Sequence, residues 1–470
     1  MASSAISGED TGVWGSLLEA VRGTRQDFTE GSISRAVLLL ATPMVLEMLM
    51  ESLFAIVNVF WVTRLGSDAV ATVGLTESMM TLVFSVAIGV SMSTTAMVAR
   101  RTGEKDAQGA ATAASQAILL GLAISLLMGL PGWLLAPKLL EWMGAQAGLI
   151  ATGQHYTAIL LGTNFVVMLL FLNNAIFRGA GDASIAMRVL WMSNLVNLVL
   201  DPCLIFGWGP FPELGVTGAG ISTLIGRSAG VGYQFWILFR GGSRVSLRLS
   251  DFRIVPGVML SLMRVSATGI LQFAIAHTSW IALVRMISVF GSVAVAGYTI
   301  GIRIFIFAIL PSWGLSGAAA TMVGQNLGAG KPERAVKAVY LTAAYNVIYL
   351  GVVTLIFVFL PETLVGFFST DPVETRYAVD CLRIVAYGNV AYAFGMVMVQ
   401  AFNGAGDTVT PTVINVIGFW LCEIPLAWAL AFPGGLEVKG VFYSIPIAEL
   451  FITLMGVAMF WRGKWKERTI

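Results

Sequence analysis

The residues of this chain that could do chemistry are polar side chains set inside long apolar segments. The most informative is Asp201, in the run Asn194-Leu-Val-Asn197-Leu-Val-Leu-Asp201-Pro202, where Asn197 precedes it by one helical turn on the same face. An ionisable group inside a membrane costs roughly 3 kcal/mol or more and by default marks a functional site. Because removal from water favours the neutral acid, we expect Asp201 to bind and release a proton.

The first long apolar segment carries a second polar stripe. Glu47, Glu51 and Asn58 are separated by one and then two helical turns, so they share one face, and Pro43 can kink the helix a turn before Glu47. Other segments of the same half contribute more polar residues, namely Glu77, Tyr156, Asn173 and Asn174. The sequence therefore predicts an acidic cluster inside the membrane, in the N-terminal half of the chain.

The C-terminal half carries a different polar set: Gln272, His277, Arg285, Arg303, Asn389, Gln400, Asn415, Glu423 and Glu449. Gln272 occupies the position that matches Glu47, and Leu283 the position that matches Asn58. We therefore expect proton or ion chemistry to be concentrated in the first half. The candidate substrate contacts are Tyr156, Asn173, Glu47, Glu77, Gln272 and His277. For His277 the competing interpretation is an interior imidazole with its hydrogen bonds satisfied.

These residues are positioned by two copies of one unit. The stretch Phe177-Arg-Gly-Ala-Gly-Asp-Ala183 returns as Phe402-Asn-Gly-Ala-Gly-Asp-Thr408, and the same offset superposes Gly89 and Gly103 on Gly314 and Gly328. Chance matches rarely keep one offset across separated blocks, so the chain is a tandem duplication. The repeated motif predicts a turn between helices, in which Gly179, Gly181, Gly404 and Gly406 supply positive φ and the following Asp acts as a cap.

The composition is that of an integral membrane protein. Of the 470 residues 57% are hydrophobic and 11% charged, whereas roughly a quarter of the residues in soluble domains are charged. Segments long enough to span lie near 36–63, 68–99, 109–136, 152–177, 184–206, 215–239, 257–289, 293–323, 335–360, 377–402, 410–432 and 437–461. We expect an all-α integral membrane protein, with twelve transmembrane helices in two pseudo-symmetric six-helix lobes that form a parallel tandem repeat.

Lys and Arg are sorted by side. The loops of one side hold only Arg64, Lys138, Arg376 and Lys439, and most other loop cations fall on the opposite side, which predicts a plasma-membrane protein with both termini cytoplasmic. The expected parts are an N-terminal segment (1–35), an N-lobe (36–239), a cytoplasmic linker (240–256), a C-lobe (257–461) and a tail (462–470). The linker is expected only to tether the lobes, with its arginines on lipid headgroups. Trp14, Leu17, Leu18 and Val21 predict a short interfacial helix, and Ser32 or Ser34 is placed to cap the first long one.

Several kinds of chemistry are excluded by the motifs. The stretch Gly328-Ala-Gly-Lys331 lacks the spacing of a phosphate loop, and no dinucleotide fingerprint or metal-binding spacing occurs. Cys203, Cys381 and Cys422 lie in or beside apolar runs as small core residues. We expect no enzyme activity, no metal, no cofactor beyond a coupling ion and no nucleic-acid partner.

The chain resembles the multidrug and toxic compound extrusion (MATE) family from Ser32 to Trp461. The motifs that carry the resemblance are Thr29-Glu-Gly-Ser-Ile with Pro43, Leu65-Gly66-Ser67, Arg100-Arg101-Thr-Gly103, Phe177-Arg-Gly-Ala-Gly-Asp182, Asn197-x-x-x-Asp201-Pro202, Gly215-Val-Thr-Gly218 and Gly324-Gln-Asn-Leu-Gly328. The resemblance implies two lobes around a central cavity and export of cationic or amphipathic drugs in exchange for H⁺ or Na⁺. The polar positions of its DinF-like branch match Tyr156, Asn174, Asn197 and Asp201. The family's first-helix aspartate falls on Asn58, so Glu51 would have to substitute for it.

The function expected from the sequence is secondary active multidrug efflux by alternating access, by a monomer in the lipid bilayer. The ion-coupling residues would be Asp201, Glu51, Asn58, Asn197 and Asn174. Two alternatives stay open: a flippase for lipid-linked precursors, which would line its cavity with many arginines, and a membrane-embedded enzyme or channel. A prenyl-transferring enzyme would need paired aspartates on its cytoplasmic loops to hold Mg²⁺, and each repeated turn offers only one.

Overall fold

The computed structural model describes residues 13–24, 26–468 and 470, and every regular element in that part of the chain is helical. The helices of the first half are α1 (Val13–Arg22), α2 (Ile33–Thr63), α3 (Ser67–Gly103), α4 (Ala107–Leu134), α5 (Ala136–Trp142), α6 (Ala147–Gly162), α7 (Asn164–Ala180), α8 (Ala183–Phe206) and α9 (Gly215–Arg240). A short 3₁₀ turn, η1 (Leu249–Phe252), lies in the linker. The second half comprises α10 (Pro256–Ser288), α11 (Ser292–Gly328), α12 (Pro332–Phe359), α13 (Pro361–Gly366), α14 (Pro372–Ala386), α15 (Asn389–Gly404), α16 (Val409–Asn415), the π-helix η2 (Val416–Glu423), α17 (Ile424–Ala431), α18 (Glu437–Trp461) and the 3₁₀ turn η3 (Lys464–Glu467).

The twelve predicted segments all correspond to helix. Within the described residues ten helical segments are long and apolar enough to span a membrane, and the α14–α15 pair makes eleven if it counts as one span. The twelfth segment is α9, whose glycines and Arg227 make it less apolar but whose 26 residues still exceed the thickness of a bilayer. The chain is therefore an all-α membrane protein of two six-helix lobes.

Two segments predicted as continuous helices are interrupted. The fourth is broken at Thr163, whose Oγ1 donates to the carbonyl of Ile159. The tenth bends by 58° between α14 and α15. The bend lies at Gly388, where a Cβ atom would collide with Pro446 of α18. The absence of a side chain lets the two backbones approach at this point.

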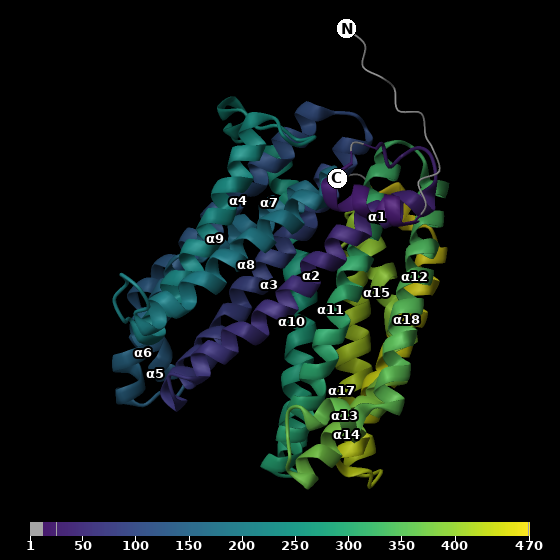
Figure 1. Cartoon of the computed structure of the whole chain (residues 1–470). Coiled ribbons are helices and arrows are strands. Elements are labelled where there is room, and N and C mark those ends of the chain that lie inside the picture. Colours follow the sequence, from purple (N-terminus) through teal and green to yellow (C-terminus); the bar gives the residue numbers. More distant parts are fainter. Residues whose placement is uncertain (1–12, 25, 469) are drawn as a thin grey trace.

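The start of α2 was predicted correctly. Ser32 is its N-cap residue, and its hydroxyl accepts a hydrogen bond of 3.4 Å from the backbone N–H of Arg35. The preceding helix, α1, lies across the end of the molecule where α2 begins (Figure 1). It buries Ala20 and leaves Trp14 and Leu18 exposed, as a helix lying in a membrane interface would.

The two lobes meet at the end that carries α1 and the C-terminus and diverge toward the opposite end (Figure 1). The contact is made by glycines of α3 and α11 without room for a Cβ atom: Gly103 faces the carbonyl of Gln325, and Gly328 faces the carbonyl of Arg100. These two contacts are one contact repeated at the duplication offset. Close approach of helices through small residues is the usual way to pack them tightly in membranes.

The repeated Gly-Ala-Gly-Asp turns use their glycines in two ways. Gly181 and Gly406 have φ values of 90° and 81°, so they supply the positive φ predicted for the turn. Gly179 and Gly404 do not, which corrects the prediction for them. They are helical, and a Cβ on either would press on the carbonyl of Thr95 or Ala320 respectively. Their role is close packing of two helices.

The linker packs against the N-lobe. Val245 and Leu247 are buried. Ser115 of α4 donates a hydrogen bond of 2.7 Å to the carbonyl of Asp251, and Gln116 donates one of 2.8 Å to the carbonyl of Arg253. These contacts fix the linker to α4 because its backbone polar groups find partners on that helix.

Candidate functional site

A cavity of about 310 Å³ lies between the two lobes. Its N-lobe wall comes from α2, α3, α7, α8 and α9, and its C-lobe wall from α10, α11 and α15. The polar side chains that line it are Glu47, Glu51, Ser91, Thr95, Asn174, Arg178, Asn194, Arg227, Thr321, Gln400 and Asn403. The remaining lining is mostly Met, Leu, Phe and Trp. An apolar cavity with a few converging polar groups is the usual form of a small-molecule site.

A second cavity of about 140 Å³ adjoins the first in the C-lobe. Both are lined by Phe273 and Trp313, whose rings meet edge to face with centroids 5.9 Å apart. The second cavity adds Gln272, Asn415 and Glu449 to the lining. The two cavities therefore form one aromatic-walled space with acids at both ends.

A chain of amides positions Glu47 in the first cavity. Glu47 is 2% exposed, and its Oε1 accepts a hydrogen bond of 3.3 Å from Asn174. Gln234 of α9 donates to Asn174 at 2.7 Å and accepts from Asn173 at 3.2 Å. Arg178 lies 4.0 Å from the same carboxylate oxygen of Glu47. These contacts join α2, α7 and α9 through the interior of the N-lobe.

Asp201 belongs to a separate group on α8 and α9. Its side chain is fully buried, and Asn197 donates hydrogen bonds to Asp201 Oδ1 at 3.3 Å and to Ser222 at 2.7 Å. Asp201 Oδ2 has no hydrogen-bond partner among the described residues. A buried carboxyl oxygen without a donor is satisfied when it carries a proton of its own or binds a cation.

The structure divides the predicted acidic cluster in two. Asn174, expected beside Asp201, is instead hydrogen-bonded to Glu47. Glu51 lines the first cavity, whereas Asp201 and Asn197 lie outside the lining of both cavities. Helical spacing placed Asn197 beside Asp201 correctly, but spacing along one helix says nothing about which helices come together.

The other predicted N-lobe residues occupy varied positions. Tyr156 is buried against Ile205 and Ala219. Asn58 is half-buried and Glu77 is exposed, and neither lines the cavities described above. Pro43 is buried inside α2, which runs through it as one continuous helix.

In the C-lobe, Gln272 lines the second cavity. His277 lies 3.1 Å from the carbonyl of Phe273 through Nδ1, which favours the interpretation of a satisfied interior imidazole. Glu423 is not among the site residues predicted from the sequence. It is 5% exposed and accepts a hydrogen bond of 2.7 Å from Ser279. It ends the π-helix η2, and such turns are frequent at functional sites.

Sequence reasoning missed Gln234, Ser222 and the two cavity arginines. Gln234 and Arg227 are polar residues inside the sixth segment, so they carried the same signal that selected Asp201. Ser222 carried none, because a serine in a membrane helix can satisfy its hydroxyl on its own backbone. Arg178 lies on α7 and Glu47 on α2, so only the fold shows that these two side chains meet.

The end where the lobes meet is strapped by the segment before α2, residues 26–31, which we call the strap. Arg334 of α12 donates to the carbonyls of Gly31 and Glu30, both at 2.7 Å. Arg244 of the linker donates to the carbonyl of Gln26 at 2.7 Å and lies over the ring of Phe28, which is fully buried. The strap therefore connects the linker, on the N-lobe, with the C-lobe.

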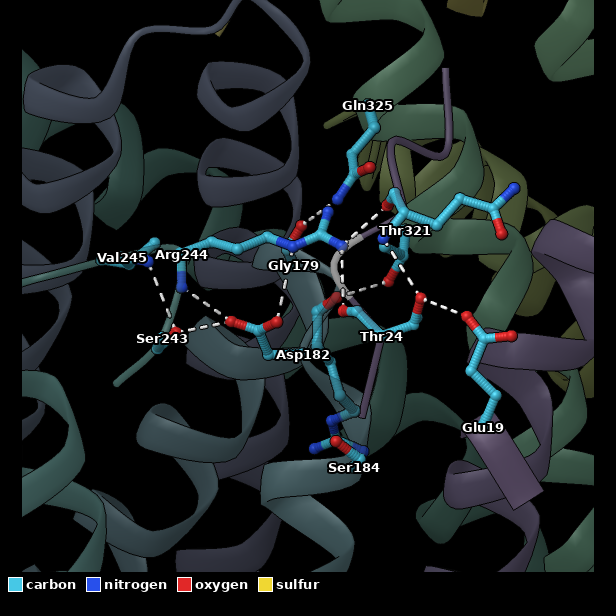
Figure 2. A network of polar contacts seen from close by, with 12 residues as sticks. Glu19, Thr24, Gly179, Asp182, Ser184, Ser243, Arg244, Val245, Thr321 and Gln325 are labelled. Carbon is cyan, nitrogen blue, oxygen red and sulfur yellow. Dashed lines mark hydrogen bonds and ion pairs between the residues drawn. The ribbon is translucent and has the colours of Figure 1, made fainter. Parts of the chain in front are cut away.

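Arg244 also holds the first repeated turn, as Figure 2 shows. Asp182 occupies the N-cap position of α8, but its side chain makes no cap hydrogen bond, which corrects the prediction for it. Its carboxylate instead accepts from the backbone N–H of Arg244 at 2.8 Å and from the hydroxyl of Ser243 at 2.7 Å. The guanidinium Nε of Arg244 lies 3.4 Å away. Arg244 thus faces protein, not the lipid headgroups expected from the sequence.

The second turn repeats this arrangement. Asp407 is the duplicate of Asp182, and it pairs with Arg468 of the tail at 3.3 Å. Asp407 lies one residue before Thr408, the N-cap of α16, and accepts a hydrogen bond of 3.4 Å from the backbone N–H of Thr410. In each lobe an arginine from the segment that follows the sixth helix binds the aspartate of the turn.

Charges at this end of the molecule favour the ionised form of Asp27. Partial burial opposes ionisation, but hydrogen bonds from Thr29 and the nearby cations Lys105 and Arg244 outweigh it and lower the pKa of Asp27. Within the described residues, no group of three or more His, Cys, Asp or Glu side chains is arranged to hold a metal ion.

Comparison with known proteins agrees with this geometry. The MatE family model matches residues 43–203 and 270–429, one match in each half. A probable multidrug resistance protein NorM of Thermotoga maritima is 23% identical over 93% of this chain and 94% of its own length. An FAD transporter of Shewanella oneidensis is 25% identical, over 93% of this chain and 96% of its own. A solved MATE structure, in complex with MaL6, superposes with a TM-score of 0.87 at 22% identity, over 96% of this chain and 99% of that one.

Proposed function

Because the chain belongs to the MatE family, a family of membrane transporters rather than enzymes, we propose that it is a secondary active multidrug efflux transporter. It exports amphipathic compounds in exchange for H⁺, with Na⁺ as the alternative coupling ion. The observation that carries the proposal is the cavity between the lobes. It combines an aromatic wall with Glu47 and Glu51, and it is closed at one end by the glycine contacts of α3 and α11. No other cofactor is needed.

The setting of the proposal is the plasma membrane, with both termini on the cytoplasmic side and the protein acting as a monomer. In that orientation the closed end faces the cytoplasm and the lobes diverge toward the outside (Figure 1). A solved structure similar to this one, with a TM-score of 0.86 at 24% identity, is that of an outward-facing multidrug resistance MATE transporter. Alternating access then requires the glycine contacts to part while the outer ends come together.

Coupling in this proposal rests on Asp201. The unpartnered Oδ2 of Asp201 supports a protonated state in the conformation described, with Asn197 donating to the other oxygen. Loss of the proton leaves a buried charge that must be wetted or paired, which changes the preferred packing of α8 on its neighbours. Pro43 is a weak point in α2, which packs on α8 and α11. A substrate that binds better to the packing formed without the proton then weakens proton binding, because the two binding equilibria are linked.

The test is dye transport in liposomes that contain the purified protein, with pH and Na⁺ gradients imposed separately. Uptake driven by one gradient alone, without ATP, supports exchange and identifies the ion. Uptake that needs ATP at a clamped gradient, or that persists with both gradients collapsed, would refute the proposal. Liposomes with the Asp201→Asn protein serve as the matched control, because that variant has nearly the same shape and cannot ionise.

A further inference from the structure

An arginine without a hydrogen-bond or ion-pair partner among the described residues faces the central cavity. Arg227 lies midway along α9, is half-buried and lines the cavity. In the described part of the chain its guanidinium makes no hydrogen bond, and no carboxylate oxygen lies within the 4.0 Å of an ion pair. The guanidinium lies over the face of Phe84, with the ring centroid 6.0 Å away. A charged side chain inside a membrane normally pairs with an opposite charge or faces water. The Arg227 guanidinium is therefore free to pair with an anionic group of a ligand bound in the cavity.

The cavity around Arg227 is lined by both acidic and basic side chains. Glu51 of α2 lines the same cavity but lies beyond ion-pair distance of Arg227, and Glu47 is engaged by Asn174 and Arg178. The N-lobe wall therefore offers two carboxylates and two guanidinium groups to one cavity. Opposite them Phe273 and Trp313 present aromatic surface. A purely cationic compound would satisfy the acids and leave Arg227 unpaired.

We propose that Arg227 is the anion-binding position of the cavity, and that the preferred substrates are aromatic zwitterions whose carboxylate pairs with Arg227. The amine or iminium group of such a compound faces Glu47 and Glu51, while its ring system packs on Phe273 and Trp313. A guanidinium binds a carboxylate through two parallel hydrogen bonds, which gives orientation as well as affinity. This inference rests on the proposed function, since it names the substrate class of the same cavity.

The test uses two dyes that differ at one group. Rhodamine 110 has a free carboxylate and is a zwitterion, and rhodamine 123 is its methyl ester and a cation. Binding to the purified full-length protein is followed by fluorescence anisotropy. We expect the Arg227→Gln variant to bind rhodamine 110 about tenfold to a hundredfold more weakly, as for the loss of a hydrogen-bonded charge. Its binding of rhodamine 123 should change less than about threefold on the same grounds. Arg227→Lys, which keeps the charge but not the paired geometry, should fall between.

The matched control is Arg264→Gln, which removes an exposed arginine of α10 outside both cavities. It should leave the binding of both dyes unchanged. Equal weakening of both dyes by Arg227→Gln, unchanged binding of rhodamine 110, or no binding of rhodamine 110 by the parental protein would each overturn the inference. Gradient-driven uptake of rhodamine 123 is measured separately. If that uptake is absent the proposed function falls, whereas normal uptake without carboxylate preference removes only the role of Arg227.

Discussion

Gly103 of α3 packs directly on the carbonyl of Gln325 of α11, and the same contact is made in reverse by Gly328 and Arg100. The closure of one end of the cavity is therefore symmetric, and it depends on the absence of two side chains. Gln325 adds a cross-lobe hydrogen bond of 2.9 Å to the carbonyl of Gly179. In the proposed transport cycle this seam has to open.

Adding a side chain at this seam should hold it open. In Gly103→Val the new atoms collide with the backbone of Gln325, and overpacking of this kind typically costs about 1–3 kcal/mol. Only the closed conformation is destabilised, because the two backbones touch only there. We expect transport to be lost. For labelling, a cysteine replaces the cavity residue Gly317 in a protein without its three native cysteines. This cysteine should react faster with an impermeant maleimide added from the cytoplasmic side. Gly74→Val, a change on the same helix with open space around it, is the control. Equal labelling of the two variants would contradict the prediction.

Replacement of the buried acid of α8 should separate folding from coupling. Asp201→Asn mimics the protonated acid and retains the hydrogen bond from Asn197, so we expect parental expression and melting temperature but no gradient-driven dye export. Export at the parental rate would rule out Asp201 as the coupling residue. Glu51→Gln should impair export partly, because Glu51 lines the cavity and is the candidate replacement for the missing acid at position 58.

A buried acid of the C-lobe, Glu423, provides a comparison. Glu423 is buried like Asp201, but its carboxylate receives a hydrogen bond from Ser279 and lies in the half where we expect no coupling. Glu423→Gln should therefore leave the dependence of dye export on the pH gradient unchanged. If it abolished that dependence while Asp201→Asn did not, proton coupling would belong to the C-lobe.

The amide chain behind Glu47 should contribute to stability. Gln234→Leu leaves the carbonyl oxygen of the Asn174 side chain without its donor, and a buried unsatisfied group costs about 1–3 kcal/mol. We expect a lower melting temperature for this variant in detergent. Gln234→Leu combined with Asn174→Leu should not recover the loss, because the buried carboxylate of Glu47 then loses its hydrogen-bond donor as well. An unchanged melting temperature in the single variant would show that the chain is not stabilising.

The arginines of the linker should differ in their effects. Arg244 binds Asp182 and the strap, whereas Arg248 is exposed and its side chain makes no described ion pair. Arg244→Gln should lower the melting temperature and raise cytoplasmic labelling of the cavity, and Arg248→Gln should do neither. Equal behaviour of the two variants, both correctly inserted, would show that the linker is only a tether.

The elements of this fold were predictable because membrane helices are specified locally. Long apolar runs give the spans, Ser32 gives a cap, and helical spacing places Asn197 beside Asp201. Contacts between helices are not local. Asn174 donates a hydrogen bond to Glu47, which lies on a helix more than a hundred residues away in the sequence. Arg244 binds Asp182 and not lipid headgroups, because the first repeated turn places this carboxylate beside the linker.

The paired contacts of Asp182 with Arg244 and of Asp407 with Arg468 identify the linker as the tail of the first copy. Together with the reciprocal glycine contacts, they make the closed seam an isologous interface, the type formed by two identical subunits about a two-fold axis. A single six-helix unit would carry all the parts of that interface on its own surface. The two lobes are thus arranged like the subunits of a homodimer joined end to end, and they differ inside the membrane, where one has an acid at position 47 and the other has glutamine at the matching position 272.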